Sequence, residues 1–177
     1  MITQGKELEN WVAVDTAHRM AAAARTAPKT KGTDYLHTAV VTGEELEQLA
    51  QTMERLAEEK GYGFFKRDAG NLRASVAVVL IGTEYQRQGL GAGCQYCNFE
   101  DCQACREQDG VCFFNPLDLG IAVGSAVSVA ADSRVDNRVM FSVGRAAREM
   151  KLLGEDVRAV IGIPVSVSKK SPYFDRK

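Results

Sequence analysis

Apolar side chains recur at helical spacing in two long stretches near the start of the chain. Across residues 8–24 they return every three or four positions, and Pro28 is expected to end this helix soon afterwards. Across residues 46–57 they form one continuous face, and Gly61 should terminate the second helix. The sequence therefore predicts two amphipathic helices in its first third.

Three shorter stretches have the composition of β-strands. Residues 35–42 and 157–168 are rich in β-branched side chains, and residues 74–82 are almost continuously apolar. An uninterrupted apolar run of this length is typical of a central strand that is covered on both faces. Between the first strand and the second helix, Thr42 and Glu45 have the spacing of a reciprocal helix cap.

Two further helices are expected in the second half of the chain. The first spans residues 116–132 and should be the buried one, because small residues such as Gly120 and Gly124 permit close approach of a neighbour. The second helix is predicted over residues 136–152. The sequence thus predicts four helices and three or four strands.

Composition and charge fit one globular domain over residues 1–177, with residues 89–115 as an inserted cysteine-rich metal-binding loop. Of the 177 residues, 45% are hydrophobic, and 22 basic side chains nearly balance 23 acidic ones. No basic patch indicates binding to nucleic acid or to a membrane surface. No stretch of about 18 apolar residues and no secretory leader pattern stands out. We therefore expect a cytoplasmic protein without nucleic-acid or membrane partners.

All five cysteines lie within one short segment, which is the most specific chemical signal in the chain. They are Cys94, Cys97, Cys102, Cys105 and Cys112, spaced C-x2-C-x4-C-x2-C-x6-C. In a reducing compartment such a cluster is more often a metal site than a disulfide framework, and an odd number of cysteines favours the same interpretation.

Two sets of four ligands and one other metal are consistent with this spacing. Cys94, Cys97, Cys102 and Cys112 could surround a four-iron cluster, whose irons each take one thiolate. Alternatively, Cys97, Cys102 and Cys105 with either Cys112 or Cys94 have the spacing of plant-type two-iron clusters. The same soft ligands could also bind a structural zinc ion. The spacing favours an iron–sulfur cluster and leaves the ligand set open.

Several ordered motifs resemble a family of uncharacterised ferredoxin-domain-containing proteins. The motifs are "AAARTAPKTKGTD", "FKRDAGN", the C-x2-C-x4-C-x9-C string, "DLGIAVGSA", "DNRVMFSVGRAA" and "GIPVSVSKKSPYFDR". The resemblance implies Cys94, Cys97, Cys102 and Cys112 as ligands of a 4Fe-4S cluster. Members often have glycine directly after the first two cysteines, where this chain has Gln95 and Asn98.

The order of elements is also similar to the nitroreductase fold, an α+β domain with helices around a small sheet. This resemblance implies flavin mononucleotide (FMN) as a cofactor, commonly held at a dimer interface. The arginine-rich motif that grips the flavin phosphate in that fold is replaced here by "HRM" and "APKTKG". Arg25, Lys29 and Lys31 are the cations that could supply this charge.

Two functions follow as alternatives. In the first, the cluster passes electrons, to a flavin in the nitroreductase-like scaffold or to a redox partner protein, and the protein is an oxidoreductase whose substrate and catalytic residues are unknown. In the second, iron or zinc only stabilises a partner-binding loop. Tyr173 and Phe174, in an otherwise polar C-terminal stretch, predict that this end docks on a surface, with a second subunit of a homodimer as the candidate.

Overall fold

The computed structural model describes residues 1–174, and Arg176, at the end of the last motif, lies outside them. Four strands form one antiparallel sheet in the order β1-β2-β4-β3. Their bounds are β1 Leu36–Thr42, β2 Ala77–Glu84, β3 Asp136–Asn137 and β4 Val157–Ser166. The three long strands match the three predicted from the sequence.

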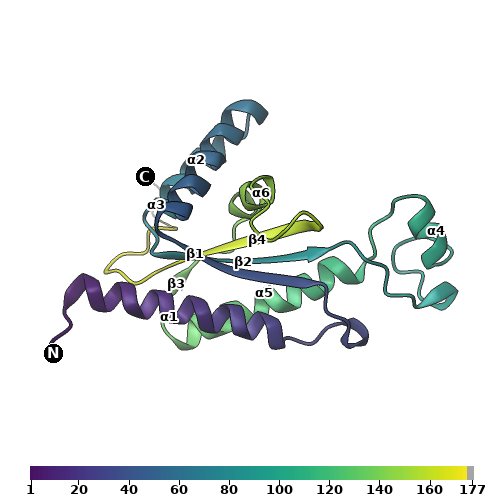
Figure 1. The fold of residues 1–177 in the computed structure, drawn as a ribbon, viewed down its shortest axis with the longest axis horizontal. Helices are drawn as coiled ribbons and strands as arrows, with labels where there is room; N and C mark the ends of the chain where they lie inside the picture. Colours follow the sequence, from purple (N-terminus) through teal and green to yellow (C-terminus); the bar gives the residue numbers. More distant parts are fainter. Residues whose placement is uncertain (175–177) are drawn as a thin grey trace.

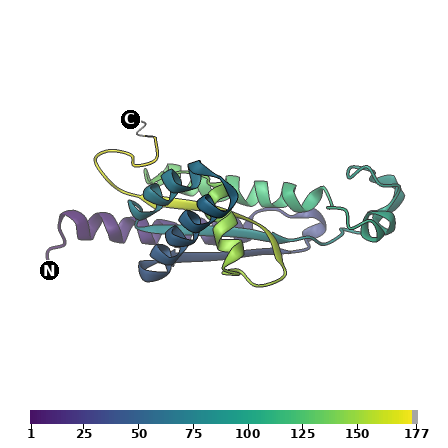
Figure 2. The same ribbon diagram turned by 90° about the horizontal axis from the view of Figure 1, so that it is seen from above.

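Helices cover both faces of this sheet (Figure 1). One face carries α1 (Gly5–Thr26) and α5 (Phe114–Asp132). The other carries α2 (Gly43–Lys60), α3 (Gly63–Arg73) and α6 (Phe141–Glu149). Seen from above in Figure 2, the second group of helices lies across the sheet. The predicted α+β arrangement of helices around a small sheet is confirmed.

The alternation of side chains along the central strands explains the two separate cores. In β2, Val78 and Leu80 face α2, α3 and α6, whereas Val79 and Ile81 face α1 and α5. All four are fully buried. Because successive strand residues point to opposite faces, a continuous apolar run is what a strand between two helical layers requires.

Three details differ from the sequence-based expectation. Helix α3 was not predicted, although Phe65, Ala69 and Leu72 are buried at helical spacing. The helix expected over residues 136–152 begins only at α6, because residues 136–140 first run extended along β4. The cap predicted from Thr42 does not form, since its side chain makes no capping hydrogen bond.

Helix α5 is less buried than its composition predicted. Gly120 and Gly124 face open space, and close packing against α1 comes instead from Ala122 and Ala126. Within residues 1–174, α5 is the single helix long and apolar enough to span a membrane, and its inner face packs on α1 and the sheet.

Candidate metal and cofactor site

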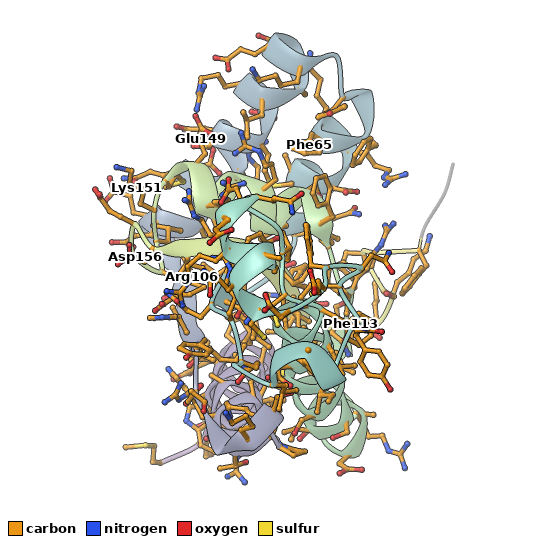
Figure 3. All side chains as sticks on the ribbon, turned by 90° about the vertical axis from the view of Figure 1, so that its right-hand side faces the viewer. Phe65, Arg106, Phe113, Glu149, Lys151 and Asp156 are labelled. Carbon is orange, nitrogen blue, oxygen red and sulfur yellow. The ribbon has the colours of Figure 1, made fainter. Side chains whose placement is uncertain are left out.

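The cysteine segment, residues 85–113, connects β2 to α5 and projects beyond the end of the sheet (Figures 1 and 2). It contains the short helices η2 (Gly91–Gly93) and α4 (Cys102–Glu107). Asp101 caps α4 by accepting a hydrogen bond from the amide of Ala104 at 2.8 Å. Figure 3 looks onto this end of the molecule, with Arg106 of α4 and Phe113 towards the viewer.

One pocket in this segment brings together four of the five cysteines. Cys94, Cys97, Cys102 and Cys112 all line it, and Cys105 does not. Phe99, Phe113 and Phe114 form much of the remaining wall. These four thiols are the set implied by the resemblance to the ferredoxin-domain family.

Cys105 is buried and is not among the residues that line the pocket. It is only 1% exposed, and burial, followed by its contact with the Cys97 thiol, raises the pKa of its own thiol. A thiol that is harder to deprotonate is a poorer metal ligand, because the thiolate is the form that binds metals. All five thiols are free of disulfide bonds.

The thiols around the pocket do not converge on one point. Within the part of the chain that the structure describes, no group of three or more Cys, His, Asp or Glu side chains is arranged to hold a single metal ion.

The turns that follow the first two cysteines have an unusual backbone. Gln95 and Asn98 both adopt left-handed conformations, with φ values of 54° and 60°. Glycine enters this region at no steric cost, and asparagine tolerates it better than most residues. Both positions therefore have a backbone conformation that glycine would adopt without strain.

The segment is held in place by contacts to its backbone carbonyls. Arg87 donates to the carbonyl oxygens of Gly110 at 3.0 Å and Cys105 at 3.4 Å. Gly110 itself lies against the ring of Phe99 and 3.0 Å from the Cys105 sulfur, measured from an ideal Cβ position. A larger side chain at Gly110 would push these groups apart, so the close approach explains the glycine.

A second loop supports the pocket from the body of the domain. Lys31 donates to the carbonyl oxygen of Gln88 at 2.9 Å. The neighbouring Thr30 is fixed to α5, because its backbone amide and hydroxyl both donate to the carboxylate of Asp118, the hydroxyl at 2.9 Å. The loop around η1 (Thr30–Gly32) thereby connects α5 to the cysteine segment.

The three cations predicted to grip a flavin phosphate are each engaged elsewhere. Arg25 pairs with Asp34 at 2.8 Å, Lys29 donates to the Arg25 carbonyl at 2.6 Å, and Lys31 holds Gln88. A phosphate bound by these cations would have to replace these contacts. Their role in flavin binding stays a prediction.

Sequence reasoning missed two groups beside the cysteines. Tyr96, Phe113 and Phe114 form a cluster of aromatic rings with centroids 5.4–5.8 Å apart. Gln88 lines the pocket and is buried. The adjacent Phe113 and Phe114 were visible in the sequence, whereas nothing local marks Gln88 among the other glutamines.

Comparison with known proteins identifies the family. Residues 108–176 match the family described as "Uncharacterized protein containing a ferredoxin domain". A protein from Archaeoglobus fulgidus, itself described as an "Uncharacterized protein", is 42% identical over 184 residues, covering 99% of this chain and 98% of that protein. The chain belongs to the ferredoxin-domain family. Of the five cysteines, the segment matched by the family model includes only Cys112.

Solved structures confirm the second resemblance, at the level of the fold. A nitroreductase from Lactococcus lactis in complex with nicotinic acid gives a TM-score of 0.62 at 12% identity, covering 95% of this chain and 81% of that one. An FMN-dependent nitroreductase from Mycobacterium smegmatis in complex with NADPH gives 0.59 at 13% identity, covering 88% and 78%. A nitroreductase family protein from Clostridium novyi gives 0.60 at 18%, covering 91% and 76%. This ferredoxin-domain protein therefore has a nitroreductase-like fold.

Proposed function

We propose that the protein is an iron–sulfur redox protein whose cluster is bound by Cys94, Cys97, Cys102 and Cys112. The observation that carries this proposal is the single pocket that these four thiols line and that Cys105 does not. Membership of a ferredoxin-domain family and the nitroreductase-like fold both support a redox role.

The residues around the pocket fit such a group. Four thiolates spread around one cavity match the need of a cluster for one thiolate on each iron. The wall also contains a buried amide donor on Gln88 without a protein partner, which suits the sulfur atoms of a cluster. The donor set and its surroundings are therefore compatible with a four-iron cluster.

Each part of the segment would have a separate task. The cluster would supply reversible one-electron transfer, with a potential set by its ligands, hydrogen bonds and exposure to solvent. Phe99, Phe113 and Phe114 limit the access of water to the pocket. Arg87 fixes the carbonyls on either side of the loop, and Lys31 ties the loop to the domain.

FMN in the nitroreductase-like scaffold would provide an electron acceptor or donor for the cluster. This part of the proposal is supported by the fold and by the FMN-dependent neighbour from Mycobacterium smegmatis. The three candidate phosphate-binding cations have protein partners in the structure, which the flavin phosphate would have to replace.

The alternative is a non-enzymatic module in which zinc or iron only stabilises a docking loop. The exposed aromatic side chains beside the pocket favour it, since Tyr96 is 66% exposed and Phe113 is also exposed. Exposed aromatic groups of this kind are enriched in protein interfaces.

Metal and flavin analysis of protein purified without oxygen tests these functions. We expect a brown protein with about four iron atoms per chain, whose visible absorption is bleached by dithionite. A colourless protein with one zinc ion per chain would refute the redox proposal and support the docking module. The same preparation should be examined for bound FMN by its fluorescence.

Two serine variants test the ligand set. Cys105→Ser should retain the iron, because Cys105 is buried outside the pocket, whereas Cys94→Ser should lose it. Iron content and visible spectra of both variants are the measurement. If Cys105→Ser loses the cluster and Cys94→Ser keeps it, the two-iron ligand set that includes Cys105 is the correct one.

A further inference from the structure

The side chain of Gln88 is buried in the wall of the cysteine pocket without a hydrogen-bond partner. Gln88 is 5% exposed, and its Nε2 atom is buried and unpaired. An amide nitrogen has two N–H donors, and leaving them unpaired away from water costs free energy. A buried donor of this kind indicates that an acceptor belongs in the pocket.

Hydrogen bonds restrain the chain at Gln88 and at the residue before it. Lys31 holds the Gln88 carbonyl oxygen at 2.9 Å, and Thr30 beside it is anchored to Asp118 of α5. On the other side, Arg87 is anchored to the carbonyl oxygen of Gly110 at 3.0 Å. The backbone of Gln88 is therefore restrained, and its buried side chain belongs to a residue that lines the pocket.

The other side-chain amides of residues 85–113 are different. Gln86, Gln95, Gln103, Gln108 and Asn98 are all exposed. Gln103, on α4, donates to Glu107 at 2.8 Å, on the surface of the loop. Burial in the wall of the pocket that the four cysteines line distinguishes Gln88 from every other side-chain amide of residues 85–113.

We infer that Gln88 donates an N–H hydrogen bond to a sulfur atom of the cluster and thereby raises its reduction potential. This inference rests on the proposed function, because it requires a redox cluster on Cys94, Cys97, Cys102 and Cys112. Reduction adds negative charge to the cluster, and a fixed donor stabilises the more negative state. Gln88 is thus a tuning residue that does not ligate iron.

The test compares the reduction potentials of wild type and two variants by anaerobic spectroelectrochemical titration. Gln88→Met keeps an unbranched side chain of similar length but has no donor. We expect the equilibrium for reduction to become about tenfold less favourable, a decrease of about 59 mV for one electron. Gln103→Met, in which the same substitution is made at an exposed site of the same loop, should leave the potential of wild type unchanged.

The outcomes separate this inference from the proposed function. Wild-type protein that binds no iron–sulfur cluster would overturn both. Gln88→Met protein that holds the cluster at the wild-type potential would overturn the inference alone.

If Gln88→Met does not retain iron, Gln88→Glu takes its place in the titration. This variant keeps the shape of the side chain and has no N–H donor when ionised. Its potential should also lie below that of wild type, and an equal potential would overturn the inference. Both Gln88 variants losing iron would support a Gln88 hydrogen bond that the cluster needs in order to bind. This conclusion requires that Gln103→Met retains its iron and that all metal-free proteins have the same melting temperature.

Discussion

The backbone turns in a left-handed conformation directly after Cys94 and again directly after Cys97. Gln95 and Asn98 adopt φ values of 54° and 60°, where most side chains crowd the backbone. Glycine would adopt this turn geometry without strain, whereas Gln95 and Asn98 adopt it at a steric cost. The steric cost of the left-handed conformation is smaller for asparagine than for glutamine.

Gln95→Gly should stabilise the protein. It removes a left-handed penalty of about 1–2 kcal/mol and adds about 0.5–1 kcal/mol of chain entropy to the unfolded state, so the expected net gain is up to about 1.5 kcal/mol. Urea unfolding of the metal-loaded protein is the measurement. Gln103→Gly, within helix α4, is the control and should lower stability. Equal or lower stability of Gln95→Gly would contradict the interpretation of this turn.

The residues of the candidate site were predictable in different degrees. The cysteines were found from their spacing, because chelation requires several ligands close together in the chain or in space. Gln88 was not found, since its role depends on burial beside residues that follow it by six to 24 positions in the sequence. The left-handed backbone at Gln95 was also invisible, because glutamine gives no local signal for it.

Helix α6 approaches β4 more closely than an ordinary side chain allows. An ideal Cβ on Gly144 would collide with the carbonyl oxygen of Val160, and one on Gly162 would collide with Val143. Two glycines facing each other therefore set the distance between this helix and the sheet. The same region brings Val143, Ala146 and Ala147 into the core.

Gly144→Ala should destabilise the protein, even though alanine favours helices. Overpacking against the backbone costs about 1–3 kcal/mol or more, which outweighs the helix preference of about 1 kcal/mol. Gly124→Ala, in a helix but facing open space, should instead stabilise by about 0.5–1 kcal/mol. The free energy of unfolding in urea is the measurement, and a stabilised Gly144→Ala variant would refute the close contact.

The elements differ in how strongly the sequence specified them. Helix α2 was clear, because its six buried residues form one stripe and Gly61 ends it in a left-handed conformation. Helix α3 was missed, since it is short, begins at a glycine and contains a second glycine at residue 70. The extended segment before α6 was mistaken for helix, because pairing with β4 overrides an apolar pattern that fits a helix.

The end of the described chain packs onto the domain itself. Tyr173 is 3% exposed within the core formed by α2, α3 and α6, and its hydroxyl lies 2.9 Å from that of Ser75. Arg138 donates to the Tyr173 carbonyl at 3.1 Å and lies over the ring of Phe174. The docking expected from Tyr173 therefore takes place within one chain, and the homodimer remains a proposal.

Tyr173→Phe should change how stability depends on alkaline pH. Burial raises the pKa of Tyr173 above its usual value of about 10, so the folded state favours the neutral phenol. This contribution to stability is fully present below about pH 10 and is lost as the pH rises through the folded-state pKa. Wild type should therefore lose stability more steeply than the variant above about pH 10.

The measurement is urea unfolding of both proteins at pH 8 and pH 10.5. At pH 8 the variant should be less stable by about 0.5–1.5 kcal/mol, through loss of the hydrogen bond with Ser75. That difference should shrink at the higher pH. A difference that stays constant would show that the pKa of Tyr173 is the same in the folded and unfolded states, which would contradict the effect of burial.

The sequence alone determined the long strands, the position of α1, α2 and α5, and the cysteine segment as the place of the chemistry. Periodicity and ligand spacing are local properties, and they survive in any fold that buries one face of each element. Only the tertiary structure decided which cysteines share a pocket, that a buried Gln88 lines the same pocket, and that Lys31 holds the loop through the Gln88 carbonyl. These features depend on contacts between residues that are distant in the chain. Such contacts are determined by packing and hydrogen bonding in the folded protein and cannot be inferred from a local sequence pattern.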